Sequence, residues 1–223
     1  MINKSVKFKI VESLEVIFEA LAEDYVVKQV GNTTVRDWMI ENHYLHRVPA
    51  IQFAFGLFKE DKMVGACTYA PPPVMLNKAF QPFPTFDLNR IALVKHDERN
   101  LVSYFISQTL KQFPVSPAII VSYADPAEGH AGYIYQALNF VYTGKGRKTG
   151  KFMIDGQEVP YQTMTRRYGT QSIPKLKQMG VDVKVEQTEG KHRYFTFVGD
   201  KRQRRDMLKL IQDKYEILGY PKI

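Results

Sequence analysis

Strand-like and helix-like segments alternate along the first 143 residues, and this order restricts the fold more than any other feature of the chain. Alternating patterns and apolar runs predict strands at residues 6–10, 51–59, 63–69, 86–94, 118–123 and 140–142. Apolar residues at helical spacing predict helices at residues 14–21, 32–44, 98–113 and 132–139. Asn32, Thr33 or Thr34 is expected to cap the second helix. The order predicts an α/β fold, a mixed central sheet with helices on its faces.

The segments after residue 143 are expected to complete this sheet. Three consecutive prolines, 71–73, end the strand at 63–69, and residues 76–86 are predicted to form an irregular loop. Further along, the patterns predict a strand at 159–167, a short helix at 172–179, a hairpin of 181–186 with 193–198, and a helix at 200–218. The chain is therefore divided into a core, residues 1–143, and a C-terminal α+β extension, residues 144–223.

The net positive charge of the chain lies in this extension. The chain has 31 Lys+Arg and 23 Asp+Glu, and 18 of the basic but only 9 of the acidic residues lie within 144–223. Such an excess favours a polyanionic partner, because displaced phosphate counterions supply affinity, although a merely solvated basic face fits the charge equally well. The candidate nucleic-acid contacts are Lys145, Arg147, Lys148 and Lys151 in a glycine-interrupted loop, and Arg202, Arg204 and Arg205 in the last helix.

Several classes of protein are excluded or disfavoured by residues that the chain lacks. The single cysteine, Cys67, rules out an internal disulfide and a multi-cysteine zinc site. No apolar run approaches the roughly 18 residues of a membrane span, and the N-terminus lacks the order of segments of a signal peptide. We therefore expect a cytoplasmic protein with no membrane partner. Patterns for a P-loop, a dinucleotide fingerprint or a serine-hydrolase elbow are also missing.

Polar residues gather where the strand at 118–123 ends. Asp125 and His130 follow this strand directly and precede a helix that carries Tyr135. Open α/β sheets bind ligands at the carboxyl ends of their strands, although Asp125 before Pro126 also suits a turn. In a second cluster, His43 and Tyr44 offer an imidazole base and a phenolic donor. The alternative is that His43 and His46 are two exposed histidines at a frayed helix end. The residues alone leave both alternatives open.

Three stretches of this sequence resemble the Mom family of phage DNA-modification proteins. They are Asn42-His43-Tyr44, Leu88-Asn89-Arg90-Ile91, and the segment from residue 121 to 144, and together they span residues 35–145. The resemblance implies the fold of the GNAT acetyltransferase superfamily. It also implies conversion of adenine in double-stranded DNA to its N6-carbamoylmethyl (acetamido) form, which protects phage DNA from restriction in the infected bacterium. By motif position, His43, Tyr44, Asp125 and Tyr135 match the family's active-site residues, and His43 and Asp125 its proposed iron ligands.

The turn at residues 95–100 departs from the acetyltransferase pattern. Acetyltransferases hold the pyrophosphate of coenzyme A in a glycine-rich turn at a helix N-terminus, but this turn has no glycine and contains Asp97 and Glu98. Only Lys95, Arg99 and Asn100 remain as anion contacts there, which weakens the case for acetyl-CoA as donor. An aminoacyl-tRNA is the alternative donor, since it suits the basic extension and the nitrogen in the product. Two other functions stay open: an N-acyltransferase for a small amine or protein lysine, and a non-catalytic DNA-binding protein.

Overall fold

A computed structural model describes residues 16–43, 50–159 and 161–221. Its strands are β1 (Tyr25–Gln29), β2 (Phe53–Lys59), β3 (Lys62–Ala70), β4 (Thr85–Leu93), β5 (Ala118–Ala124), β6 (Val141–Lys145), β7 (Thr149–Ile154), β8 (Gln157–Val159), β9 (Val183–Thr188) and β10 (His192–Val198). Its helices are residues 16–24, α2 (Asn32–Asn42), α3 (Val74–Ala79), α4 (Leu101–Lys111), α5 (Tyr133–Ala137), α6 (Tyr161–Tyr168), α7 (Ile173–Gln178) and α8 (Lys201–Lys214). A short 3-10 turn, Pro126–Glu128, follows β5.

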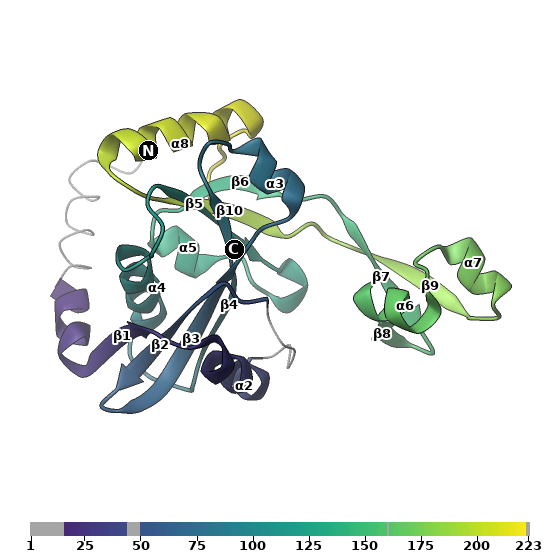
Figure 1. The fold of residues 1–223 in the computed structure, drawn as a ribbon, viewed down its shortest axis with the longest axis horizontal. Helices are drawn as coiled ribbons and strands as arrows, with labels where there is room; N and C mark the ends of the chain where they lie inside the picture. The colour runs from purple at the N-terminus through teal and green to yellow at the C-terminus, as the bar shows by residue number, and fades with distance from the viewer. Residues whose placement is uncertain (1–15, 44–49, 160, 222–223) are drawn as a thin grey trace.

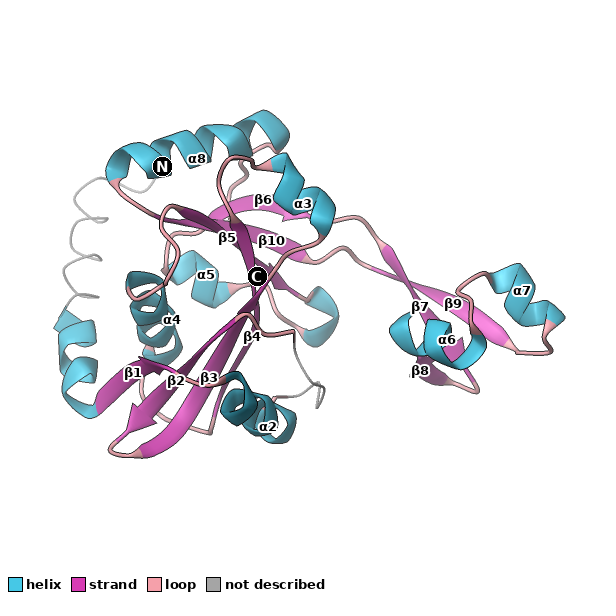
Figure 2. Ribbon diagram, viewed as in Figure 1, coloured by secondary structure: helices cyan, strands magenta, loops and turns pink. Residues whose placement is uncertain are grey.

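The main sheet has seven strands in the order β1-β2-β3-β4-β5-β10-β6. Strands β4 and β5 are parallel, and every other neighbouring pair is antiparallel. Helices cover both faces of the sheet (Figure 2). The structure therefore confirms the predicted α/β class with a mixed sheet. The C-terminal strand β10 lies inside this sheet, between β5 and β6.

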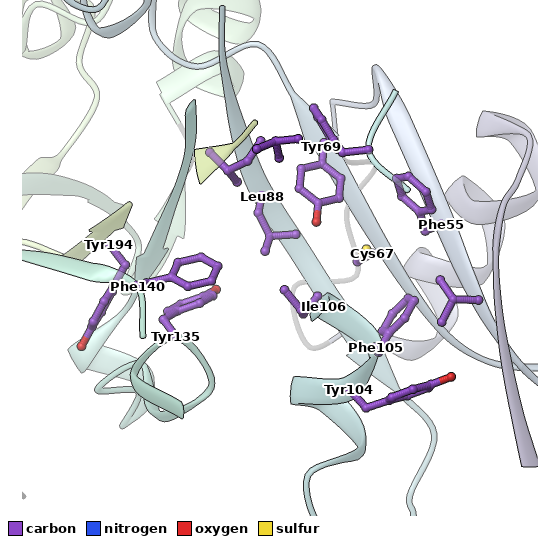
Figure 3. Close-up of a cluster of buried hydrophobic side chains, with 14 of the residues drawn as sticks. Phe55, Cys67, Tyr69, Leu88, Tyr104, Phe105, Ile106, Tyr135, Phe140 and Tyr194 are labelled. Atoms are coloured by element: carbon purple, nitrogen blue, oxygen red, sulfur yellow. The ribbon is translucent and has the colours of Figure 1, made fainter. Parts of the chain in front are cut away.

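Each face of the main sheet has its own hydrophobic core. On one face, α4 and α5 pack on the strands, and the core includes Phe55, Leu88, Phe105 and Tyr135 (Figure 3). On the other face, α3 and α8 cover β5 and β10 through a smaller core that includes Phe80, Val121, Phe195 and Met207. Helix α2 packs on the same face further along, against β2 and β3. Successive residues of a strand point to opposite faces, so β5 and β10 contribute to both cores.

Residues 146–190 form an arm that projects from the sheet (Figure 1). The arm contains a second sheet, of order β8-β7-β9, with α6 and α7 packed around Phe152, Met164 and Leu176. Two glycines face each other where the arm joins the main sheet. A Cβ added to Gly190 would lie 1.8 Å from the carbonyl oxygen of Gly146. The two backbone segments are therefore so close here that no residue with a side chain fits at position 190.

The N-terminal half departs from the sequence prediction in three places. The strand before α2 is β1, at Tyr25–Gln29, which the pattern did not reveal because only Tyr25 and Val27 of its five residues are buried. The strand predicted at 6–10 lies outside the described residues. Helix α2 begins after Gly31, without a side-chain cap. The segment predicted as a loop at 76–86 contains most of α3, which starts after the three prolines, and the first residues of β4.

The C-terminal half departs in two places. The segment predicted as a strand at 159–167 is mostly helix α6, because turning it into a helix buries Met164 in the core of the arm. The predicted hairpin of 181–186 with 193–198 is also wrong. Strand β9 pairs with β7 in the arm, whereas β10 pairs with β5 and β6 in the main sheet, so the two strands belong to different sheets. Local patterns do not show which distant strand offers a free edge.

Candidate functional site

A cleft opens where the parallel strands β4 and β5 separate. The two strands pair over only three residues each, ending at Asp87 opposite Val121, and then diverge. An extra residue in β4, Asn89, causes a bulge opposite Thr68 and Tyr69, and its side chain is held by Thr68 and by the carbonyl of Ala50. The cleft has a volume of about 380 Å³ and is lined by both strands, by α5 and by the turn before it.

Three of the four predicted catalytic residues line this cleft. His43, at the end of α2, Asp125, just after β5, and Tyr135, on α5, come from three separate elements and meet there. His43 and Tyr135 are buried, and Asp125 is half-buried. Tyr44 lies outside the described residues. His130 also lines the cleft, from the turn before α5.

Tyr135 is fixed by a hydrogen-bond chain to β4. The Ser122 hydroxyl oxygen lies 2.7 Å from the Tyr135 hydroxyl and 2.8 Å from the carbonyl oxygen of Leu88. A carbonyl only accepts and Ser122 has a single proton, so the two bonds coexist when Ser122 donates to Leu88 and Tyr135 donates to Ser122. The tyrosine ring packs against Phe140 and Tyr194, with centroids 5.3 and 5.2 Å away (Figure 3). Both contacts hold the phenol in one orientation.

Asp125 is an ionised carboxylate with a cationic partner. Its Oδ2 lies 2.9 Å from Nζ of Lys191, and its Oδ1 accepts from the amide of Ala127 at 3.1 Å. Partial burial raises the pKa of Asp125, but the Lys191 hydrogen bond and charge, the Ala127 amide and the charge of Lys151 lower it overall. Lys191 belongs to the junction with the arm, so the arm and the cleft share an ion pair.

The residues of this cleft do not fit an iron ion. Iron sites of this kind need several His, Asp, Glu or Cys ligands at one point. Within residues 16–43, 50–159 and 161–221, no three such side chains gather as a ligand set. The Lys191 ammonium on Asp125 also opposes a second cation at that carboxylate.

The turn at residues 95–100 holds a carboxylate, that of Glu98, in a fixed position. The Glu98 carboxylate accepts from the Tyr25 hydroxyl at 2.5 Å and from Nζ of Lys59 at 3.3 Å. The Tyr25 hydrogen bond leads the causes that lower the pKa of Glu98 to about 2. Lys95, Arg99 and Asn100 are exposed, and Asn100 precedes α4 in a left-handed conformation without a side-chain cap. The residues present do not fit a coenzyme A pyrophosphate, because a fixed carboxylate stands beside the helix start that would receive it.

The two basic clusters lie at opposite ends of β10. The predicted loop is shorter than expected, because Lys145 ends β6 and Lys151 lies in β7, with Arg147 and Lys148 in the connection between them. His192, at the start of β10, is opposite Ala124 of β5 and Lys145 of β6, so this basic segment, called the basic loop below, lies at the cleft edge of the sheet. Val198, at the end of β10, is opposite Ala118, and α8 follows it. Seven residues of strand separate the ends by roughly 20 Å. Arg202, Arg204 and Arg205 therefore lie far from the cleft, at the opposite edge.

Sequence reasoning missed two charged residues near the cleft, Asp87 and Lys191. Asp87 lies on β4 and Lys191 in the chain between β9 and β10. The sequence did contain a sign of Asp87, because an acidic residue stands there between two apolar residues of a strand, Phe86 and Leu88. Lys191 gave no signal, since only the pairing of β10 with β5 brings it to Asp125.

Comparison with known proteins identifies a family. The model described as the Mom protein family matches residues 24–222. A comparison with curated proteins found none that matches. In the described part of the chain, every helix is too short or too polar to cross a membrane.

Solved structures with a similar arrangement are acetyltransferases. The acetyltransferase of the GNAT family from Streptococcus pneumoniae is 9% identical, with a TM-score of 0.43, over 79% of this chain and 100% of its own. Diaminobutyrate acetyltransferase EctA from Paenibacillus lautus is 11% identical, with a TM-score of 0.41, over 78% and 95%. An N-acetyltransferase from Staphylococcus aureus Mu50 is 9% identical, with a TM-score of 0.43, over 78% and 99%. Similarities this distant say nothing of substrates.

Proposed function

Because the chain belongs to the Mom protein family, we propose that it is a transferase that attaches a carbamoylmethyl group to the N6 nitrogen of adenine in double-stranded DNA, which protects the DNA from restriction. One observation carries this proposal. The cleft lined by His43, Asp125 and Tyr135 and the loop with Lys145, Arg147, Lys148 and Lys151 share one edge of the sheet. A duplex held by that loop would present its bases to the cleft.

The target adenine has to leave the base stack to reach the cleft. Extrusion of a base costs a few kcal/mol, which phosphate contacts and stacking in the pocket offset. A volume of about 380 Å³ lies in the range of small-ligand sites and admits a purine. The exposed side chains of Arg147 and Lys148 are suited to the phosphates beside the extruded base.

The residues of the cleft suit different tasks. Asp125 stays ionised and is oriented by Lys191 and by the amide of Ala127, so it can accept a hydrogen bond from the substrate. His43 supplies an imidazole, which exchanges protons near neutral pH. Tyr135 is held against Ser122 and presents its ring and hydroxyl at a fixed place. These groups position the acceptor nitrogen and carry its proton.

The donor is proposed to be an aminoacyl-tRNA. Glu98, held beside the start of α4 by Tyr25 and Lys59, weighs against a coenzyme A pyrophosphate at that helix. The basic loop at the cleft edge suits a second nucleic acid as well as DNA. Transfer from a glycyl-tRNA forms the bond from N6 to the glycyl carbonyl carbon, breaks the ester and releases the tRNA with a free hydroxyl. The N6-glycyl product is an isomer of the carbamoylmethyl product and has to rearrange to it, with no atom gained or lost.

Asp125→Asn tests this function. We expect it to abolish adenine modification, because it removes the charge at the cleft while keeping the side chain's shape and the hydrogen bond to Ala127. The ion pair with Lys191 is partly exposed, so its loss should cost about 1 kcal/mol of folding stability or less. The measurement is mass spectrometry of nucleosides from plasmid DNA recovered after expression.

Asp155→Asn is the matched control, since Asp155 is an exposed acid in the turn between β7 and β8. The control should modify plasmid DNA at the wild-type level. Plasmid adenine that stays unmodified with the wild-type protein in a host that provides charged tRNA would contradict the proposed function. Wild-type modification by Asp125→Asn would remove Asp125 from it.

A further inference from the structure

His96 is an imidazole of the cleft wall that the proposed mechanism does not use. It lies in the turn between β4 and α4, and it lines the cleft together with Leu93. The same two residues also line a second cavity, with a volume of about 300 Å³. His96 therefore lies where the cleft and the second cavity adjoin.

The two nitrogens of the His96 ring have different surroundings. Nδ1 is buried and has no hydrogen-bond partner among the described residues. Nε2, in contrast, is not buried, and 25% of the side chain is exposed. A buried polar atom without a partner is uncommon in a native protein, and a catalytic role is one of the reasons for which it is retained. One nitrogen thus faces protein and the other is accessible.

The atom nearest to the buried nitrogen is a carboxylate oxygen. Oε2 of Glu98 lies 3.8 Å from Nδ1 of His96, which is an ion-pair distance but longer than a hydrogen bond. The other oxygen of Glu98, Oε1, accepts from the Tyr25 hydroxyl and from Nζ of Lys59, so Oε2 is left for the imidazole. Hydrogen bonds between catalytic groups are often this long before substrate binds, and they shorten in the complex.

The turn that carries both residues is attached to the sheet. The partners of Glu98 come from β1 and β2, and the amide of Val94 donates to the carbonyl of Val64 on β3 at 2.9 Å. A carboxylate held in this way accepts from the Nδ1–H of an imidazole and fixes its tautomer and orientation. Nε2 of His96 is then the atom that exchanges a proton.

We propose that His96 is a catalytic residue of this transferase and that Glu98 is its positioning residue. The inference rests on the proposed function, in which N6 of adenine attacks the carbonyl carbon of an aminoacyl ester. The bond from N6 to this carbon forms, and the bond from the carbon to the ester oxygen breaks. N6 loses one proton, and the leaving oxygen gains one to become a hydroxyl.

The positions of the residues divide these two proton transfers. His43 and Asp125 line the cleft and not the second cavity, so they belong to the side of the acceptor nitrogen. His96 lines both cavities and thus lies between the space for the base and the adjoining space for the donor. The proton from N6 passes to His43 and on to solvent. Nε2 of His96 gives a proton to the leaving oxygen and takes another from solvent.

The test compares two donors whose leaving groups differ in their need for a proton. Glycyl-tRNA has to release a hydroxyl, whereas the glycyl thioester of N-acetylcysteamine releases a thiolate, which leaves without one. The acceptor is a short single-stranded thymidine oligonucleotide with one central deoxyadenosine, because a single strand avoids the cost of extrusion. Mass spectrometry of the oligonucleotide measures initial rates above the background without protein.

His96→Gln should affect the two reactions differently. We expect its rate with glycyl-tRNA to fall by about 100-fold or more, the usual effect of losing a general acid, and its rate with the thioester to fall only slightly. Glu98→Gln should show the same pattern with a smaller loss. Asp97→Asn, which alters the exposed acid beside His96, is the matched control and should keep both wild-type rates.

A second measurement does not depend on transfer. Long-range proton–nitrogen NMR spectra of the full-length protein show which ring nitrogen of a neutral histidine carries the proton. At mildly alkaline pH we expect His96 to carry it on Nδ1, and the loss of the signal in His96→Gln identifies the ring. A proton on Nε2, with Nδ1 bare, would overturn the proposal without any variant having to be active.

Equal losses with both donors in His96→Gln would also overturn the proposal, because a distorted cleft slows both reactions alike. So would a wild-type rate of His96→Gln with glycyl-tRNA, and the proposed function would then remain standing. Adenine that stays unmodified with the wild-type protein and both donors would instead contradict the proposed function. The NMR spectrum would in that case still decide whether Glu98 orients His96.

Discussion

At the scale of single residues, two carboxylates near the cleft, Asp125 in its wall and Asp87 on β4, have different surroundings. Asp125 has a cation and an amide as partners, and its pKa is lowered overall. Asp87 is desolvated and has a raised pKa, near 6. The difference arises from burial, because the same lysine, Lys191, acts on both.

Asp87 should make the protein less stable as the pH rises. Its pKa is about 6 in the folded protein and near 3.8 when the chain is unfolded. Between these values the folded state binds more protons than the unfolded state, so the free energy of unfolding falls with increasing pH, by about 3 kcal/mol at most. Asp87→Asn removes this cost. We expect its melting temperature to exceed that of the wild type by several degrees at pH 7.5, and by much less at pH 4.

Scanning calorimetry at the two pH values gives the comparison. Asp155→Asn is again the control, since an exposed acid should produce no such difference. Equal melting temperatures of Asp87→Asn and the wild type at both pH values would show that Asp87 titrates normally in the folded protein.

At the scale of elements, the start of α4 is built differently from an anion-binding helix terminus. A helix binds a phosphate when its first amides are open and its dipole is unopposed. Here the preceding turn carries Glu98, which a tyrosine from β1 and a lysine from β2 hold in place. Both partners come from the sheet, so the position of the carboxylate is set by the fold rather than by the turn.

Acetyl-CoA should therefore bind only weakly. Isothermal titration calorimetry is expected to show no micromolar affinity, because Glu98 repels the pyrophosphate at the helix start. Glu98→Gln keeps the size of the side chain and removes this repulsion, and we expect it to bind acetyl-CoA more tightly than the wild type. Asp97→Asn, which alters the exposed neighbouring acid, is the control. Micromolar binding by the wild type, with labelled acetyl carbon transferred to adenine, would restore the coenzyme as donor.

At the scale of the whole molecule, the fold separates the positive charge that the sequence concentrates near the C-terminus. Strand β10 leads from the arm into the middle of the sheet, and α8 begins at its far end. The basic loop thus lies at the cleft edge and the arginines of α8 at the opposite edge. Figure 1 shows the arm projecting from the sheet and α8 packed along the main body, away from the arm. One duplex at the cleft edge would contact the first cluster and not the second.

The salt dependence of DNA binding should therefore distinguish the clusters. Replacing Arg147, Lys148 and Lys151 with glutamine is expected to reduce the slope of log affinity against log salt by up to about 3, since each lost phosphate contact removes roughly 0.9. Replacing Arg202, Arg204 and Arg205 in the same way should leave the slope unchanged. Filter binding over a range of salt concentrations provides the measurement. Equal slopes for the wild type and the first variant would identify the loop as a solvated face.

The sequence by itself determined the elements whose patterns are local. The strands β2 to β5, the helix α4 and the α/β class follow from periodicity, and the motif residues His43, Asp125 and Tyr135 stand at the ends or on the faces of such elements. Each of these signals is contained within about a dozen neighbouring residues. The patterns left the roles of the three motif residues open, and the resemblance to the Mom family is what grouped them into one candidate site.

Only the tertiary structure decided which distant segments meet. Strand β10 pairs with β5 rather than β9, and this pairing brings Lys191 to Asp125 and separates the two basic clusters. Residues 161–168 became a helix because Met164 fills the core of the arm. The Oδ1 atom of Asp87 is buried without a partner in the described chain, at the residue where β4 and β5 begin to separate. Pairing partners, burial and the loss of a hydrogen-bond donor depend on chain segments far away in the sequence, so local patterns contain no record of them.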